Sequence, residues 1–182
     1  MVLDKMINRP YSIEGYNPQW TTQFEEVKKN LSRIFGEKAL AIEHVGSTSI
    51  PGMQAKPIID SLVLVSQMEH FDKERKEMSA LGYENGDNYI APDTLIFFKT
   101  APDGSKLENI HICVQGSHKA TQFVIMRDYF RSHPEKVKEY SDLKQKLKEK
   151  FPDDYIAYRI GKHQFLEDIE TLARAELYDN KE

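Results

Sequence analysis

Residues 43–65 read EHVGSTSIPGMQAKPIIDSLVLV, two apolar segments separated by a loop of glycine, proline and hydroxyl residues. This stretch starts in a short apolar segment, crosses a loop from Gly46 to Pro57, and enters a second apolar segment at residues 58–65. The second segment is rich in β-branched residues, which predicts a buried strand. The loop holds two glycines and two prolines, which are typical of a turn. Two strands joined by this loop are therefore the predicted centre of the protein.

The rest of the chain predicts an α+β fold with a mixed sheet of about five strands and helices packed on it. The expected strands cover residues 39–45, 58–65, 83–90, 94–100 and 107–115. The expected helices cover residues 17–36, 67–81, 119–132, 135–150 and 153–178, the first starting at Asn17 and Pro18. We expect one domain over residues 1–182, with an N-terminal arm at 1–16 and a helical C-terminal layer from about residue 118.

The composition is that of a globular protein of 182 residues with a net charge of −4. This charge argues against strong nucleic-acid binding, which needs a basic face. No apolar run approaches the ~18 residues of a membrane helix, and the start of the chain has no signal-peptide pattern. The single cysteine, Cys113, favours a reducing compartment and a place in the core. We therefore expect a cytoplasmic protein without a membrane partner.

The loop between the two predicted strands has the chemistry of a phosphate site. Gly46 and Gly52 permit close backbone approach, and Ser47, Thr48 and Ser49 supply hydroxyl groups. The Walker Lys-Ser/Thr signature is absent, so this is no P-loop. The alternative is an ordinary turn, because glycine, serine and proline are common in loops.

Asp60 stands early in an otherwise apolar strand. A buried carboxylate is costly without a metal ion or a cationic partner, so this position is a candidate functional residue. The alternative is a structural carboxylate that pairs with Lys56 or caps the N–H groups of the loop.

The pair Gly46-Ser47 followed by Asp60 resembles the polymerase-β-type nucleotidyltransferase pattern. The run 43–52 with 56–60 is similar to the GrpB family, and stretches 16–20, 109–113 and 123–134 fit the same family. The resemblance implies a nucleotidyltransferase-like fold, in which the Gly-Ser turn holds a triphosphate and the aspartate binds a divalent metal. Mg²⁺ or Mn²⁺ is the expected cofactor, and a nucleotide or phosphorylated small molecule is the expected ligand.

One position departs from the nucleotidyltransferase pattern. A second carboxylate normally stands two residues after the first, on the same face of the strand, and here that position is Leu62. Other groups must then complete the site. Glu43 is a candidate metal ligand, and His111 is a candidate metal ligand or acid-base group, with a hydrogen-bonded sheet histidine as the alternative.

Cationic and amide groups add candidate phosphate ligands. Arg127 and Arg131 are four residues apart on one helix face and could grip a phosphate, although a solvated face with salt bridges is equally typical. The helix at 135–150 carries charges of both signs and is expected to be exposed. The long C-terminal helix is a candidate surface for a homodimer.

Three functions are compatible with the pattern: a metal-dependent nucleotidyltransferase, a non-catalytic nucleotide-binding or metabolite-binding protein with a degenerate site, and a phosphate-ester hydrolase. The expected catalytic residues are Asp60 and His111, and the expected metal ligands are Asp60 and Glu43. The expected phosphate-binding or nucleotide-binding residues are Gly46, Ser47, Thr48, Lys56, Asn109, Arg127 and Arg131.

Overall fold

The structure is a computed structural model that describes residues 11–68, 71–86 and 94–179 of the chain. Within this part, five strands form one mixed sheet in the order β1-β2-β5-β4-β3. The strands are β1 (Ala41–Val45), β2 (Ile59–Val65), β3 (Glu84–Gly86), β4 (Thr94–Thr100) and β5 (Lys106–Val114). The central pair β2 and β5 is parallel, whereas the other neighbouring strands are antiparallel. The predicted α+β class with a mixed sheet is confirmed.

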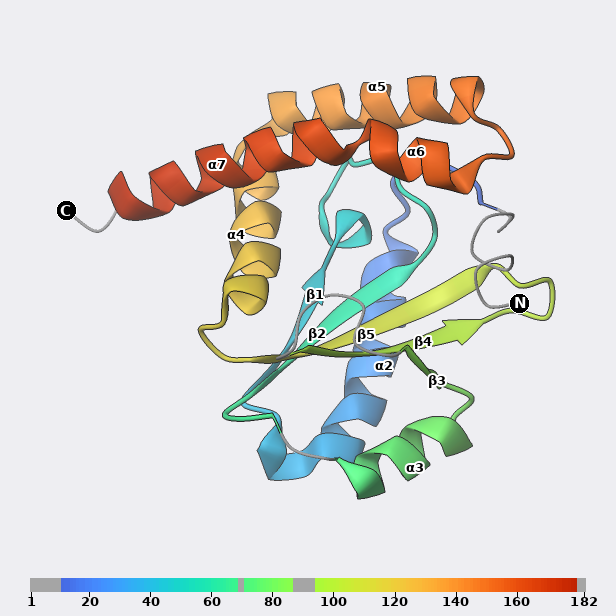
Figure 1. Ribbon diagram of the computed structural model, residues 1–182, viewed down its shortest axis with the longest axis vertical. Helices are drawn as coiled ribbons and strands as arrows, with labels where there is room; N and C mark the ends of the chain where they lie inside the picture. The colour runs from blue at the N-terminus through green and yellow to red at the C-terminus, as the bar shows by residue number, and fades with distance from the viewer. Residues whose placement is uncertain (1–10, 69–70, 87–93, 180–182) are drawn as a thin grey trace.

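Helices cover both faces of the sheet and one of its ends (Figure 1). They are α2 (Gln19–Phe35), α3 (Asp72–Ala80), α4 (His118–Ser132), α5 (Pro134–Lys150), α6 (Tyr155–Gly161) and α7 (His163–Asp179). Helices α2 and α3 pack on one face, and α4 packs on the other. The layer formed by α5, α6 and α7 lies across the end of the sheet that carries the loop between β1 and β2 (Figure 1).

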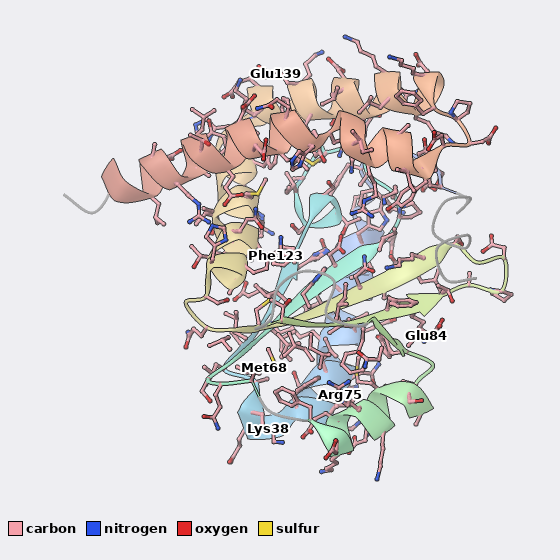
Figure 2. The ribbon with its side chains drawn as sticks, in the orientation of Figure 1. Lys38, Met68, Arg75, Glu84, Phe123 and Glu139 are labelled. Carbon is pink, nitrogen blue, oxygen red and sulfur yellow. The ribbon has the colours of Figure 1, made fainter. Side chains whose placement is uncertain are left out.

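The first helix shows why the sequence folds this way. Trp20, Phe24, Val27 and Leu31 recur at helical spacing, and all four are buried against the sheet. The helix begins at Gln19, two residues later than the predicted start, but the Asn17 side chain still accepts a hydrogen bond from a backbone N–H of the first turn, at 3.0 Å. The larger core lies between this helix, α3 and the sheet (Figure 2).

Several predicted boundaries need correction. The helix expected over residues 153–178 is two helices, α6 and α7, and the helix expected from residue 67 begins at Asp72. The strand expected at residues 83–90 is described only at Glu84–Gly86, since residues 87–93 lie outside the described part, as do residues 1–10 of the predicted arm. In the described ranges no helix combines the length and the apolar character that a membrane span requires.

Candidate functional site

Strand register brings Asp60 together with two residues of β5. Asp60 lies beside Asn109, and residue 62 lies beside His111. Because alternate residues share a face, Asp60, Asn109 and His111 all point to the side of the sheet that α4 covers. The Asn109 side-chain amide donates to Asp60 Oδ1 at 2.8 Å. His111 Nε2 lies 3.6 Å from the same oxygen.

The orientation of Asn109 is fixed from its other end, because Lys106 Nζ donates to its Oδ1 at 2.9 Å. Burial alone would raise the pKa of Asp60. His111, the Asn109 amide and the charge of Lys56 outweigh it, so the pKa lies below its ordinary value. Asp60 is therefore ionised at neutral pH. Its side chain keeps 25% of its surface exposed, so the charge is accessible to a ligand.

His111 is buried with 7% of its surface exposed, and its ring lies 4.5 Å from the ring of Phe123, centroid to centroid. Its Nδ1 atom has no hydrogen-bond partner among the described residues. A buried ring nitrogen without a partner is uncommon in a purely structural histidine. The predicted pairing of Asp60 with His111 in one site is thus a feature of the geometry, whereas a catalytic role for either residue stays a prediction.

The Gly46 turn is built against Asp60. Gly46 has φ 70° and ψ −176°, a conformation that is essentially restricted to glycine. A Cβ atom at this position would lie 2.5 Å from Asp60 Oδ2. The glycine is therefore required both by the backbone and by the close approach of the carboxylate.

Thr48 stabilises the loop through hydrogen bonds of its buried hydroxyl group. Its hydroxyl donates to the carbonyl of Ile58 at 3.1 Å, and it lies 3.1 Å from His44 Nε2. Since the hydroxyl proton is used, the histidine must donate through Nε2–H. His44 points to the α2 face, where its ring stacks on Phe24, and burial lowers its pKa to about 4. The sequence left open whether residue 43 or 44 faces the site, and the register excludes His44.

Side chains from α4 and α5 hold the loop between β1 and β2 in place. Arg131 of α4 donates to the carbonyl of Ser49, and Ser141 of α5 accepts from the backbone N–H of Gln54 at 3.1 Å. Lys144 of α5 donates to the Gln54 carbonyl and to Ser47 Oγ, the latter at 3.3 Å. The turn is therefore fixed by the helices before any ligand binds.

Three lysines converge between the loop and the helical layer. Lys56 donates to the Tyr155 hydroxyl at 2.6 Å, and Lys144 is only 2% exposed. Burial lowers the pKa of Lys144 well below its ordinary value, and the charges of Lys162 and Lys56 lower it further. The pKa of Lys162 falls to about 8, first through burial and then through Lys56, although Asp60 acts in the opposite direction.

Neither Lys144 nor Lys162 has a carboxylate within ion-pair distance in the part of the chain that the structure describes. Each of the three ammonium groups instead lies over a tyrosine ring, at 4.3 to 4.7 Å from its centroid. Buried cations that repel one another are costly unless an anion compensates them. The turn, Asp60 and this lysine cluster (Lys56, Lys144 and Lys162) are the candidate site.

Contacts within the protein already engage the side chains of Arg127, Arg131 and Glu43. Arg127 donates to Glu43 at 2.8 Å and to Asp128 at 2.7 Å, while Arg131 binds the loop carbonyl. These contacts match the salt-bridge alternative. The predicted phosphate role of the arginines and the predicted metal role of Glu43 stay predictions, and these contacts do not support them.

The small number of metal-binding side chains beside Asp60 limits how many metal ions this site can hold. Leu62 is fully buried in an apolar cluster with Val45, Cys113 and Ala120, which agrees with the predicted core position of the cysteine. In residues 11–68, 71–86 and 94–179, no group of three His, Cys, Asp or Glu side chains could hold a metal ion. Mg²⁺ often takes one or two carboxylates and completes its shell with water and substrate phosphates. Asp60 fits one such ion shared with a bound phosphate, and the two-metal arrangement does not fit.

The sequence did not place Lys144 and Lys162 in the candidate site. The exposed character predicted for the 135–150 helix is wrong at Lys144, which is buried. The signal was present, because this lysine belongs to the stripe of α5 residues that are buried together. The stripe consists of Val137, Tyr140, Ser141, Lys144 and Leu147. A lysine in a buried stripe is rare and points to a specific use.

Comparisons with known proteins identify relatives over most of the chain. The family described as GrpB protein matches residues 10–172. The UPF0157 protein YqkA of Bacillus subtilis is 37% identical over 167 residues, which cover 91% of this chain and 48% of that protein. The UPF0157 protein PA4798 of Pseudomonas aeruginosa is 30% identical, over 87% of this chain and 65% of that protein. The chain thus spans about half to two thirds of the length of these two relatives.

Solved structures agree with these relationships. The crystal structure of the conserved protein GrpB from Enterococcus faecalis has a TM-score of 0.86 and 32% identity, covering 92% of this chain and 99% of that one. A crystal structure of the Cid1 poly(U) polymerase with Mg 3′-dATP bound has a TM-score of 0.50 and 16% identity, covering 82% of this chain and 49% of that one. This second likeness concerns the fold alone.

Proposed function

The chain belongs to the GrpB family, and we propose that it binds a nucleotide or another phosphorylated small molecule between the Gly46–Thr48 turn and the lysine cluster. The observation that carries this proposal is Lys144. The residue is only 2% exposed, its ammonium group donates to Ser47 of the turn at 3.3 Å, and it has no carboxylate partner among the described residues. A phosphate group would supply the missing negative charge.

The lysine cluster and Asp60, on two sides of the proposed site, interact with different parts of a ligand. The lysine cluster attracts a polyanion, and the Ser47 hydroxyl beside it offers a donor to a phosphate oxygen. Asp60 lies at the opposite border and repels phosphate directly, so it selects a ligand that arrives with a cation or one that presents a hydroxyl group. A shared Mg²⁺ or Mn²⁺ ion, when bound, would neutralise phosphate charge at Asp60.

We further propose nucleotidyl transfer to an unidentified acceptor as the reaction of this site. Asp60 is ionised, and its Oδ1 is already contacted by Asn109 and His111. Oδ2, which faces Gly46, is then the oxygen that can hold a proton or an ion. Non-catalytic binding is the second candidate, and Leu62 in place of the second carboxylate favours it.

Thermal unfolding with a panel of nucleoside triphosphates, with and without Mg²⁺ or Mn²⁺, tests the proposal, since a ligand of the native state raises the Tm. We expect a nucleotide-dependent increase in the wild type. The Asp60→Asn variant should lose the metal-dependent part of it, and Glu43→Gln should keep that part. An absent shift across the panel, or an unchanged metal effect in Asp60→Asn, would contradict the proposal. A turnover assay on any bound nucleotide then separates transfer from binding.

A further inference from the structure

Lys162 differs from the two other lysines of the lysine cluster in what its ammonium group contacts. Lys144 donates to Ser47 Oγ and to a carbonyl of the loop. Lys56 donates to the Tyr155 hydroxyl at 2.6 Å. The Lys162 ammonium, in contrast, forms no hydrogen bond and no ion pair with any residue that the structure describes. Its side chain is half-buried, and its nitrogen is not sealed from solvent, so Lys162 presents a free amine.

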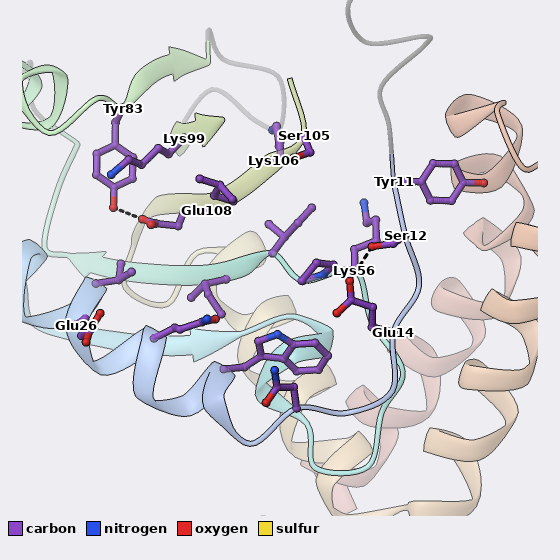
Figure 3. A pocket seen from close by; sticks show the side chains of 18 of the residues that line it. Tyr11, Ser12, Glu14, Glu26, Lys56, Tyr83, Lys99, Ser105, Lys106 and Glu108 are labelled. Atoms are coloured by element: carbon purple, nitrogen blue, oxygen red, sulfur yellow. Dashed lines mark hydrogen bonds between the residues drawn. The ribbon is translucent and has the colours of Figure 1, made fainter. Parts of the chain in front are cut away.

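The ring of Tyr158 holds this free amine in place. The ammonium group lies over the ring, 4.7 Å from its centroid, and such a contact uses no hydrogen-bond acceptor. Tyr158 is only 1% exposed, and its ring packs against that of Tyr11, with the two centroids 4.8 Å apart. Figure 3 shows Tyr11 pointing from the N-terminal segment toward the helical layer. Lys162 is thus positioned before a ligand binds, while its nitrogen stays available.

The surroundings of Lys162 favour the neutral form of its amine. Burial lowers its pKa, and the charges of Lys56 and Arg159 lower it further. Tyr155 and Asp60 act in the opposite direction, and the resulting pKa is about 8. At pH 8 about half of this amine is neutral, against less than about 1% of an ordinary lysine with a pKa of 10.5. A desolvated lysine amine next to another cation is the arrangement that attacks carbonyl carbons.

A small molecule has room at the Lys56 end of the lysine cluster. Tyr11, Lys56 and Tyr155 line a cavity of about 840 Å³ (Figure 3). This volume falls within the roughly 300–1,000 Å³ of small-molecule pockets. The cavity therefore gives a ligand of this size access to the cluster.

We propose that Lys162 forms an imine with a phosphorylated aldehyde bound at the lysine cluster. The phosphate group binds Lys144 and Ser47, which leaves the aldehyde carbon to the free amine of Lys162. Because this reaction rests on the phosphate site proposed above, it uses the same cations, but it adds a second class of ligand and needs no nucleotide.

The reaction balances without a further reactant. The neutral nitrogen of Lys162 attacks the carbonyl carbon, a C–N bond forms, and the π electrons of the C=O bond move to the oxygen. The oxygen takes up a proton while the nitrogen loses one, which gives a carbinolamine. The C–O bond then breaks, the oxygen leaves as water with the second proton of the amine, and a C=N bond remains. No atom is oxidised or reduced.

Trapping with cyanoborohydride at pH 8 tests the proposal, with D-glyceraldehyde 3-phosphate as the probe and D-glyceraldehyde as the matched aldehyde without phosphate. Cyanoborohydride reduces an imine to a stable secondary amine, which peptide mass spectrometry locates. The phosphorylated probe should label Lys162 at least about tenfold faster than glyceraldehyde does, because charged hydrogen bonds to the phosphate add to binding. Lys138, which is 77% exposed and paired with Asp142, should be labelled at least about tenfold more slowly than Lys162, since its amine stays protonated.

Variants link the labelling to the phosphate site. Lys144→Met should slow the labelling of Lys162 by the phosphorylated probe by about tenfold or more, because it removes a phosphate ligand. Lys138→Met is the matched control and should leave the labelling of Lys162 unchanged. Lys162→Arg keeps the charge without a nucleophilic amine, so its total labelling should fall to that of the surface lysines. Thermal unfolding checks that each variant is folded. If Lys144→Met is not folded, inorganic pyrophosphate takes its place as a competitor and should slow the labelling of the wild type.

Four results would overturn the proposal: labelling of Lys162 no faster than that of Lys138, equal labelling by the two aldehydes, an undiminished rate in Lys144→Met, or an undiminished rate with pyrophosphate. Titration of Mg·ATP into the same wild-type protein separates the imine from the nucleotide function. Binding of Mg·ATP without labelling of Lys162 would overturn the imine and leave the phosphate site standing. Absence of both would overturn the phosphate site, and the imine with it.

Discussion

Replacing Lys162 with methionine should stabilise the protein while weakening its binding of phosphate ligands. Lys162 is held in a partly buried position beside Lys56, and its pKa falls from the ordinary 10.5 to about 8. That difference corresponds to about 3 kcal/mol of destabilisation of the charged form. Because part of the side chain remains in contact with solvent, screening reduces the figure, and we expect a gain of about 1 to 3 kcal/mol.

The pH dependence of this gain has a defined sign. Below pH 8 the wild-type lysine is protonated in both states and carries the full cost of burial. Between about 8 and 10.5 the folded state releases the proton while the unfolded state retains it, so wild-type stability rises with pH. The advantage of Lys162→Met should therefore be greatest at neutral pH and disappear as the pH approaches 10.5.

Urea unfolding of both proteins across this pH range measures the effect. Lys138→Met is the matched control, since Lys138 is 77% exposed and paired with Asp142, and it should bring no comparable gain. A Lys162→Met variant less stable than the wild type at neutral pH, or a stability gain that did not depend on pH, would show that the charge of Lys162 is not destabilising in the folded state. Unchanged nucleotide affinity in the variant would separately contradict its role as a ligand.

The Gly46 turn, His44 and Lys162 each give a measurable expectation. Gly46→Ala should lower the free energy of unfolding, measured in urea, more than Gly52→Ala does, and it should abolish the nucleotide-dependent Tm increase. Both glycines have positive φ, but of the two only Gly46 has a position where a Cβ atom would meet Asp60, at 2.5 Å. Equal losses of stability in the two variants would show that the turn does not pack against Asp60 in this way. The free energy of unfolding of the wild type should fall by up to about 3 kcal/mol as the pH drops from 6.5 to about 4, because His44 takes up a proton on unfolding. His44→Phe should show a smaller loss, and a pH profile identical to that of the wild type would contradict the burial of a neutral His44. Binding of a nucleotide near pH 8 should be accompanied by proton uptake, because a bound anion raises the pKa of Lys162. Calorimetry in two buffers of different ionisation enthalpy measures this uptake, and its absence would show that Lys162 does not contact the phosphate.

The strands and most helices could be predicted because their periodicity is local. The break between α6 and α7 was not predicted, although Gly161, the last residue of α6, has low helix propensity and is a local signal for a helix end. The glycine also has a tertiary reason, because a Cβ atom at this position would lie 2.4 Å from a methyl group of Leu147 on α5.

The candidate site also contains residues that local sequence could indicate and residues that only tertiary packing brings in. Asp60 and the Gly46 turn were expected in one site because their segment resembles the nucleotidyltransferase pattern, and in the structure the turn packs against the Asp60 carboxylate. Lys144 lies 97 residues after Ser47 in the chain and contacts it only because the helical layer packs on the loop. The same packing brings Lys162 close enough to Asp60 for an electrostatic interaction. The partnership of Arg127 with Glu43 depends on the same packing and could not be distinguished beforehand from a phosphate grip.

Isothermal titration of Mg·ATP into the wild type and the Lys144→Met variant measures whether this buried lysine binds phosphate, with adenosine as the ligand that lacks phosphate. We expect saturable binding of Mg·ATP by the wild type, no measurable binding of adenosine, and at least about tenfold weaker binding by the variant, because a buried cation pairs with the phosphate. Equal affinities of the two proteins for Mg·ATP, or for ATP and adenosine, would contradict this expectation.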